Sequence, residues 1–148
     1  MSDITTKIIP VQHDYVASEE KVKAAVTYIK EIVPDCQVTV NISETTQFVD
    51  CGGELEEITC PSCGESVSFD WWGEAMETAG ENEFSDLSVK LPCCGHDSSL
   101  NALKYYLPCG FARMEIGIEN LEKTLDEEQL AEIGKILGTK VKVILARY

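Results

Sequence analysis

Apolar and polar residues recur along the chain with two different periods, and the longer period predicts a helix near each end. Across residues 22–33, apolar side chains return every three or four positions, which gives a helix one apolar face. Ser18 can cap the N-terminus of this helix, and Pro34 ends the pattern. A second helix is predicted over residues 126–137, where a capping-box pattern opens the segment and Gly138 can end it.

The shorter, two-residue period predicts strands on either side of both helices. Pro10 restricts the first strand to a sheet edge or an irregular start, because proline cannot donate to a ladder. In the second strand, one face is expected to be buried; it carries Cys36, Val38, Val40 and Ile42. The predicted strands cover residues 7–16, 36–42, 111–118 and 140–148.

The order of these elements predicts the fold class. When residues 44–109 are set aside, the chain reads strand–helix–strand twice. Two such units commonly form a ferredoxin-like α+β sandwich with both helices on one face of the sheet. We therefore expect an α+β domain from residues 1–43 and 110–148, with residues 44–109 inserted between its second and third strands.

The inserted region is expected to contain short strands and loops. Alternating patterns predict strands at 57–59, 66–69 and 87–91, with an acidic loop between the last two. Ser98 or Ser99 can cap a short helix that holds Leu100 and Leu103. The strands would bring the two ends of the insert together.

Two cysteine clusters in the insert predict a metal site. Cys60-Pro61-Ser62-Cys63-Gly64 places two thiols three residues apart on a turn whose glycine accepts a left-handed backbone. Pro92-Cys93-Cys94-Gly95-His96 offers three further ligands. Alternatively, the thiols pack as small hydrophobic groups. A redox dithiol is disfavoured because the flanks of the first cluster are predicted as strands, not as the start of a helix. We expect zinc.

The sequence leaves open which groups complete the site. Cys93 and His96 repeat the spacing of Cys60 and Cys63, whereas Cys94-Gly95 repeats the register of Cys63-Gly64.

The chain also resembles bacterial zinc-ribbon proteins of unassigned function. The elements that carry the resemblance lie within roughly residues 58–118 and are Cys60–Gly64, Leu91–Gly95, Ser99–Asn101 and Gly110–Arg113. The resemblance implies that Cys93 and Cys94 form the second ligand pair, with His96 as the rival fourth ligand. It implies no activity. Cys36 is expected in the core, and Cys51 and Cys109 are not expected to be ligands.

The charge of the chain argues against nucleic acid as a partner. The net charge is −14, and residues 51–100 carry 11 acidic residues against one base, Lys90. Phosphate binding needs clustered cations. An acidic surface that keeps the protein soluble is one interpretation, and recognition of a basic protein is the other.

Two adjacent tryptophans lie within this acidic region. With Glu74 and Glu77, Trp71 and Trp72 can form a partner surface for a cationic protein. The alternative is that one indole covers the zinc site and the other packs against the main domain.

The expected cellular location follows from features that the sequence lacks. No apolar run approaches the roughly 18 residues that a membrane span needs, and the N-terminus has no signal-peptide pattern. We expect a cytoplasmic protein whose seven cysteines are ligands and thiols rather than disulfides.

The sequence gives little support to an enzyme. It contains no phosphate loop, nucleophile elbow or dinucleotide fingerprint, and His13 beside Asp14 is expected to be structural. We expect a non-enzymatic protein-binding or regulatory module. A zinc-dependent hydrolase with a three-ligand site is the alternative. The sequence does not indicate an oligomeric state.

Overall fold

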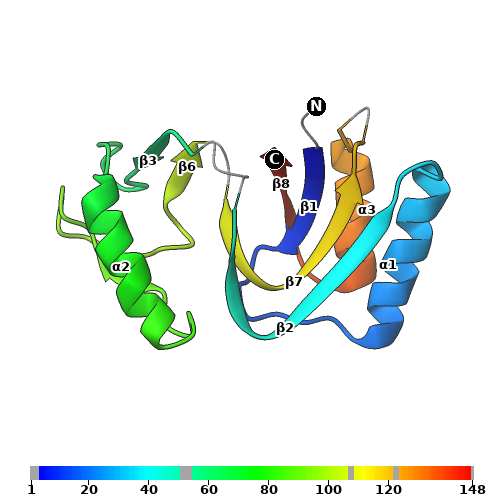
Figure 1. The fold of residues 1–148 in the computed structure, drawn as a ribbon, viewed down its shortest axis with the longest axis horizontal. Coiled ribbons are helices and arrows are strands. Elements are labelled where there is room, and N and C mark those ends of the chain that lie inside the picture. Colours follow the sequence, from blue (N-terminus) through cyan, green and yellow to red (C-terminus); the bar gives the residue numbers. More distant parts are fainter. Residues whose placement is uncertain (1–3, 51–54, 107–108, 122–123, 148) are drawn as a thin grey trace.

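The computed structural model describes residues 4–50, 55–106, 109–121 and 124–147. Within these residues the chain is an α+β protein with three helices and three antiparallel sheets (Figure 1). The largest sheet has the strand order β2-β7-β1-β8. Its strands are β1 (Ile4–Pro10), β2 (Val38–Val49), β7 (Gly110–Glu119) and β8 (Val141–Arg147).

Two helices, α1 (Glu19–Ile32) and α3 (Glu127–Leu137), cover one face of this sheet (Figure 1). The side chains of β1 alternate between its faces, so that Ile8 enters the core under the helices and Ile9 enters a second core on the other face. The helix-side core is almost fully removed from water. It contains Ile8, Ala17, Val22, Ala25, Ile29, Met114, Ile116, Ile118, Ile133 and Leu137.

The two helices that the sequence predicts near the ends of the chain are confirmed, together with their caps. The Ser18 hydroxyl accepts the N–H of Lys21 at 3.4 Å. Asp126 and Gln129 form a reciprocal capping box. The Asp126 carboxylate accepts the Gln129 N–H at 2.7 Å, and the Gln129 side-chain oxygen accepts the Asp126 N–H at 3.0 Å. Gly138 ends α3 in the left-handed conformation, with φ at 83°. Each cap involves residues that are close together in the sequence, and the sequence alone was therefore sufficient to locate the two helices.

The predicted edge position of the first strand is wrong. β1 lies between β7 and β8 in the sheet. Pro10 is the last residue of β1, where it stands opposite Val141. The end of a strand tolerates proline because the ladder stops there.

The expected burial of the second strand is wrong for Val40 and Ile42, which are 38% and 51% exposed. β2 is an edge strand, and of its apolar residues only Val38 reaches the margin of the helix-side core. β2 also continues to Val49: after a register shift between Ile42 and Gln47, Gln47, Phe48 and Val49 again pair with β7.

The insert contains two two-stranded sheets and one helix. β3 (Glu57–Thr59) pairs with β6 (Lys104–Tyr106), and β4 (Ser88–Lys90) pairs with β5 (Asp97–Ser99). The remaining element is α2 (Phe69–Glu81). In Figure 1 the insert lies across the sheet from α1 and α3.

Three predictions in the insert are wrong. Most of the acidic segment that was expected to be a loop before residue 87 is helical, because α2 runs from Phe69 to Glu81. Phe69 opens a helix instead of ending a strand, because Ser68 caps it by accepting the N–H of Trp71 at 3.1 Å. Within α2, Trp72, Met76 and Ala79 then recur at helical spacing and pack on the insert core. After Ser99 the chain forms a turn and then β6, so the predicted short helix is absent from this described segment.

The second core joins the insert to the sheet. Phe48 and Phe111 of the sheet pack with their ring centroids 5.2 Å apart, and Trp72 of α2 meets Phe48 edge-on at 5.7 Å. Asn101 of the insert also forms hydrogen bonds with the main domain. Its side-chain NH₂ donates to the Val11 carbonyl at 3.1 Å, and its side-chain oxygen accepts the Phe111 N–H at 3.2 Å. The insert therefore rests on the sheet through a continuous apolar core.

Candidate metal centre

The first cysteine cluster is a tight turn that follows β3. The N–H of Gly64 donates to the Cys60 carbonyl at 3.0 Å, and the N–H of Cys60 donates to the Glu65 carbonyl at 2.9 Å. Gly64 has a φ of 78°, in the left-handed region that favours glycine. The turn points the thiols of Cys60 and Cys63 to one side.

The second cluster repeats the backbone of the first. The N–H of Gly95 donates to the Leu91 carbonyl at 2.9 Å, and the N–H of Leu91 donates to the His96 carbonyl at 2.9 Å. Gly95 has a φ of 71°. In this register Cys94 corresponds to Cys63, as the repeated Cys-Gly pair predicts, and Leu91 occupies the position of Cys60.

The two turns bring four thiols together, and any two of the four sulfur atoms lie within 4.8 Å of each other. Cys60 Sγ lies 3.7 Å from Cys94 Sγ, and Cys63 Sγ lies 3.3 Å from Cys93 Sγ. In a tetrahedral site with metal–sulfur bonds of about 2.3 Å, the sulfur atoms are about 3.8 Å apart. The four thiols therefore lie close enough to hold one metal ion.

His96 lies beside this group. Its Nδ1 is 3.2 Å from Cys94 Sγ. Among the described residues, the set of ligand atoms that are all mutually close contains the four cysteines without His96. The imidazole is thus a neighbour of one thiol, and the geometry favours the cysteine set.

The thiols differ in their ease of ionisation. Burial opposes ionisation of Cys60, but backbone N–H groups of Cys63 and Ser62 and the neighbouring thiols stabilise its thiolate and lower its pKa to about 6. At Cys93, the hydrogen bond with Cys63 and burial raise the pKa to about 12. Ionisation is therefore easier at Cys60 than at Cys93, and a bound cation would favour the thiolate form of each ligand.

The other cysteines lie apart from this centre. Cys36 packs half-buried against the helix-side core, as predicted. Cys109 is buried in the second core. Cys51 lies outside the described residues. Neither Cys36 nor Cys109 is part of the four-thiol group.

Trp71 and Trp72 are both half-buried on the second core. The indole N–H of Trp72 donates to the Tyr105 hydroxyl at 3.2 Å, while Glu74 and Glu77 are exposed on α2. The contact of Trp72 with Phe48 matches the alternative in which one indole packs against the main domain.

His13 makes a local contact with β2. Its Nδ1 lies 3.1 Å from the Thr46 hydroxyl, and that hydroxyl also lies 3.4 Å from the His13 carbonyl. These contacts tie the loop after β1 to β2, which is the structural role that the sequence predicts for this residue.

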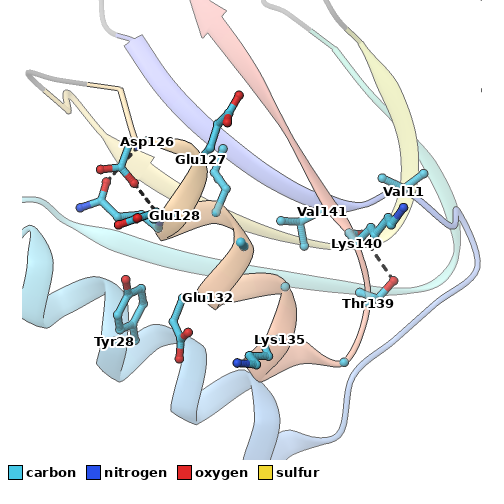
Figure 2. Close-up of a pocket in the computed structure, with 15 residues that line it drawn as sticks. Val11, Tyr28, Asp126, Glu127, Glu128, Glu132, Lys135, Thr139, Lys140 and Val141 are labelled. Carbon is cyan, nitrogen blue, oxygen red and sulfur yellow. Dashed lines mark hydrogen bonds between the residues drawn. The ribbon is translucent and has the colours of Figure 1, made fainter.

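A surface hollow of about 1410 Å³ lies around α3 (Figure 2). Figure 2 shows the acidic side chains of Asp126, Glu127 and Glu128 at one end of α3 and Lys140 near the start of β8. The lining of this hollow includes none of the four thiols. The hollow is therefore no substrate pocket for the thiol cluster.

No protein-family model matches this chain, and comparisons with curated proteins and with solved structures found no similar protein. In the part of the chain that the structure describes, no helix is both long and apolar enough to cross a membrane. The functional assignment must therefore come from the geometry of the four thiols and of the surface around them.

Proposed function

We propose that Cys60, Cys63, Cys93 and Cys94 bind one zinc ion that stabilises the insert. The observation that carries this proposal is the mutual approach of four sulfur atoms within 4.8 Å. Zinc favours four thiolates in tetrahedral geometry, and soft thiolate ligands select it over magnesium or calcium. The insert is small and shares its core with the main sheet, so a metal that links its two cysteine turns would add to its stability.

We propose further that the chain is a ferredoxin-like sandwich with an inserted zinc ribbon. The strand order β2-β7-β1-β8, with α1 and α3 on one face, supports the sandwich. The two matching turns at Gly64 and Gly95 support the ribbon.

The proposed role is that of a non-enzymatic protein-binding or regulatory module. Four protein ligands fill a tetrahedral zinc site, whereas a catalytic zinc keeps one position open for water. A zinc-dependent hydrolase would need one of the four thiols to leave the zinc ion, so that a water molecule could bind in its place. The four-ligand geometry therefore favours a structural zinc.

A basic protein is the proposed partner. Residues 51–100 hold 11 acidic residues and one base, so the insert would repel nucleic acid. A reducing compartment such as the cytoplasm would keep the four thiols available for metal.

Metal analysis of the full chain, purified without chelator, tests the zinc proposal. We expect one equivalent of zinc per chain and its loss in Cys60→Ser. Cys109→Ser is the matched control, because it also alters a buried cysteine but not a proposed ligand, and it should keep zinc. Less than half an equivalent of zinc in folded wild-type protein would overturn the proposal.

A further inference from the structure

Two aromatic side chains of the insert remain exposed to solvent. Phe69, the first residue of α2, is 47% exposed, and Tyr106, the last residue of β6, is 61% exposed. The ring of Phe69 meets Trp72 edge-on, with centroids 6.4 Å apart. Tyr106 stands opposite Glu57 across the β3–β6 pair. The sequence did not single out either ring, because their exposure depends on α2 and β6, which it did not predict.

The two rings line a hollow of about 480 Å³, and among the described residues of its lining the charged ones are all acidic. Glu56 and Glu57 contribute the carboxylates. The Ser66 hydroxyl donates to Glu57 Oε1 at 2.6 Å, which fixes the direction of that carboxylate. Lys104 lies two residues before Tyr106 on β6, outside this lining.

This combination of groups suits a long cationic side chain. The faces of aromatic rings attract cations, and carboxylates attract them further. Arginine and lysine also carry apolar stems that pack on rings while the charged head reaches a polar neighbour. An anionic ligand would be repelled by Glu56 and Glu57, and a purely apolar one would leave both carboxylates without a counter-charge.

We propose that the Phe69–Tyr106 groove, formed by Glu56, Glu57, Ser66, Phe69 and Tyr106, binds an arginine or lysine side chain of a basic protein partner. This inference rests on the proposed protein-binding function and gives it a surface and a ligand chemistry. The groove differs from the Trp71–Trp72 surface, whose indoles are half-buried on the core.

The proposed zinc site lies next to this groove in the chain. β3 ends one residue before Cys60, and Ser66 follows the turn that holds Cys63. The N–H of Val67 donates to the Ile58 carbonyl at 2.8 Å, which joins the two arms of this hairpin. A metal that fixes the hairpin therefore also fixes one wall of the groove.

Binding of a defined basic peptide tests the groove. A fluorescein-labelled, alternating Arg-Gly peptide is titrated with the zinc-loaded full chain, and fluorescence anisotropy gives Kd. We expect a Phe69→Ala, Tyr106→Ala double variant to raise Kd about tenfold, because two ring contacts with a cation are lost. Glu56→Gln, Glu57→Gln should raise Kd by a similar factor.

A matched pair of acids separates the groove from the general charge of the insert. Glu81 and Glu83 are exposed in the insert, away from the lining of the groove, so Glu81→Gln, Glu83→Gln changes the net charge by the same amount as the groove variant. We expect this control to change Kd by less than about twofold. An alternating Glu-Gly peptide should not bind, and every variant should keep the zinc content and circular dichroism of the wild type.

Each contrary outcome has a distinct meaning. If both acid pairs weaken binding equally, the peptide responds to the acidic field and the groove proposal fails. It also fails if the aromatic variant binds as tightly as wild type, or if zinc-loaded wild type does not bind the peptide. In those cases the zinc site stands. Absence of zinc in folded wild-type protein would instead overturn the proposed function.

Discussion

Leu91 occupies, in the second cysteine turn, the position that Cys60 occupies in the first. Each of the two carbonyls accepts the N–H of the glycine four residues later, at 3.0 Å for Cys60 and 2.9 Å for Leu91. Leu91 is only 1% exposed and joins the insert core. The two turns are therefore alike in backbone but not in their ligands, since the second cannot supply a thiol from its first position.

Cys93 supplies the missing thiol from the position that Ser62 holds in the first turn. The resulting site is asymmetric. Cys60 is buried and accepts N–H groups of Ser62 and Cys63 at 3.3 and 3.4 Å, whereas Cys93 is exposed. The thiol from the unusual position is thus exposed to solvent, as Cys63 is, whereas Cys60 is not.

A position swap tests this equivalence. Leu91→Cys combined with Cys93→Ser moves the fourth thiol to the position that corresponds to Cys60. We expect the double variant to retain one equivalent of zinc, because the repeated backbone directs the new thiol towards Cys94. The loss of buried leucine surface should cost about 1–3 kcal/mol of unfolding free energy. Metal analysis and denaturant unfolding measure the two effects.

Cys93→Ser alone is the control for this swap and should bind zinc more weakly than wild type. If the double variant holds no more zinc than this single variant, the two turns are not interchangeable and the backbone repeat has no bearing on ligand geometry.

A second prediction concerns His96. His96→Ala should keep stoichiometric zinc, and Cys94→Ser should lose it, because Cys94 belongs to the four-thiol group and His96 does not. The colorimetric release of zinc by a thiol reagent provides the measurement. Retained zinc in Cys94→Ser, with loss in His96→Ala, would favour Cys93 and His96 as the second pair.

Removal of the metal should affect the insert more than the main sheet and the two helices that cover it. Chelation is expected to melt α2 and preserve α1 and α3, because their core is separate from that of the insert. Roughly one third of the helical circular dichroism signal should disappear, in proportion to the lengths of the three helices. Tryptophan emission should shift to the red, since both indoles lie in α2. Complete loss of helix on chelation would contradict this separation.

Oxidation should begin at the exposed pair. Cys63 and Cys93 are both exposed, and their sulfur atoms lie 3.3 Å apart. In metal-free protein, hydrogen peroxide should join them in a disulfide while it is reduced to two water molecules. Peptide mapping by mass spectrometry should find the Cys63–Cys93 linkage first. A first linkage between Cys60 and Cys94 would show that burial does not protect Cys60.

The sequence by itself determined the two helices that cover the main sheet and the two cysteine turns of the candidate metal site, but it left open which groups complete that site. The helix ends are set by capping residues that act within one helical turn, namely Ser18, Asp126 and Gly138. Their capping effect can therefore be predicted from the neighbouring residues. The two Cys-Gly pairs likewise specify two turns, because each glycine serves a backbone conformation that other residues rarely adopt.

Only the tertiary structure decided which apolar residues are buried and how the two turns correspond. Val40 alternates like a buried strand residue, yet β2 is an edge strand that the helix-side core reaches only at Val38. The correspondence between Leu91 and Cys60 is defined by backbone hydrogen bonds, which cannot be read from the sequence. Exposure and register depend on contacts between segments far apart in the chain, and a local alternating pattern does not specify whether a strand lies at the edge or in the centre of a sheet.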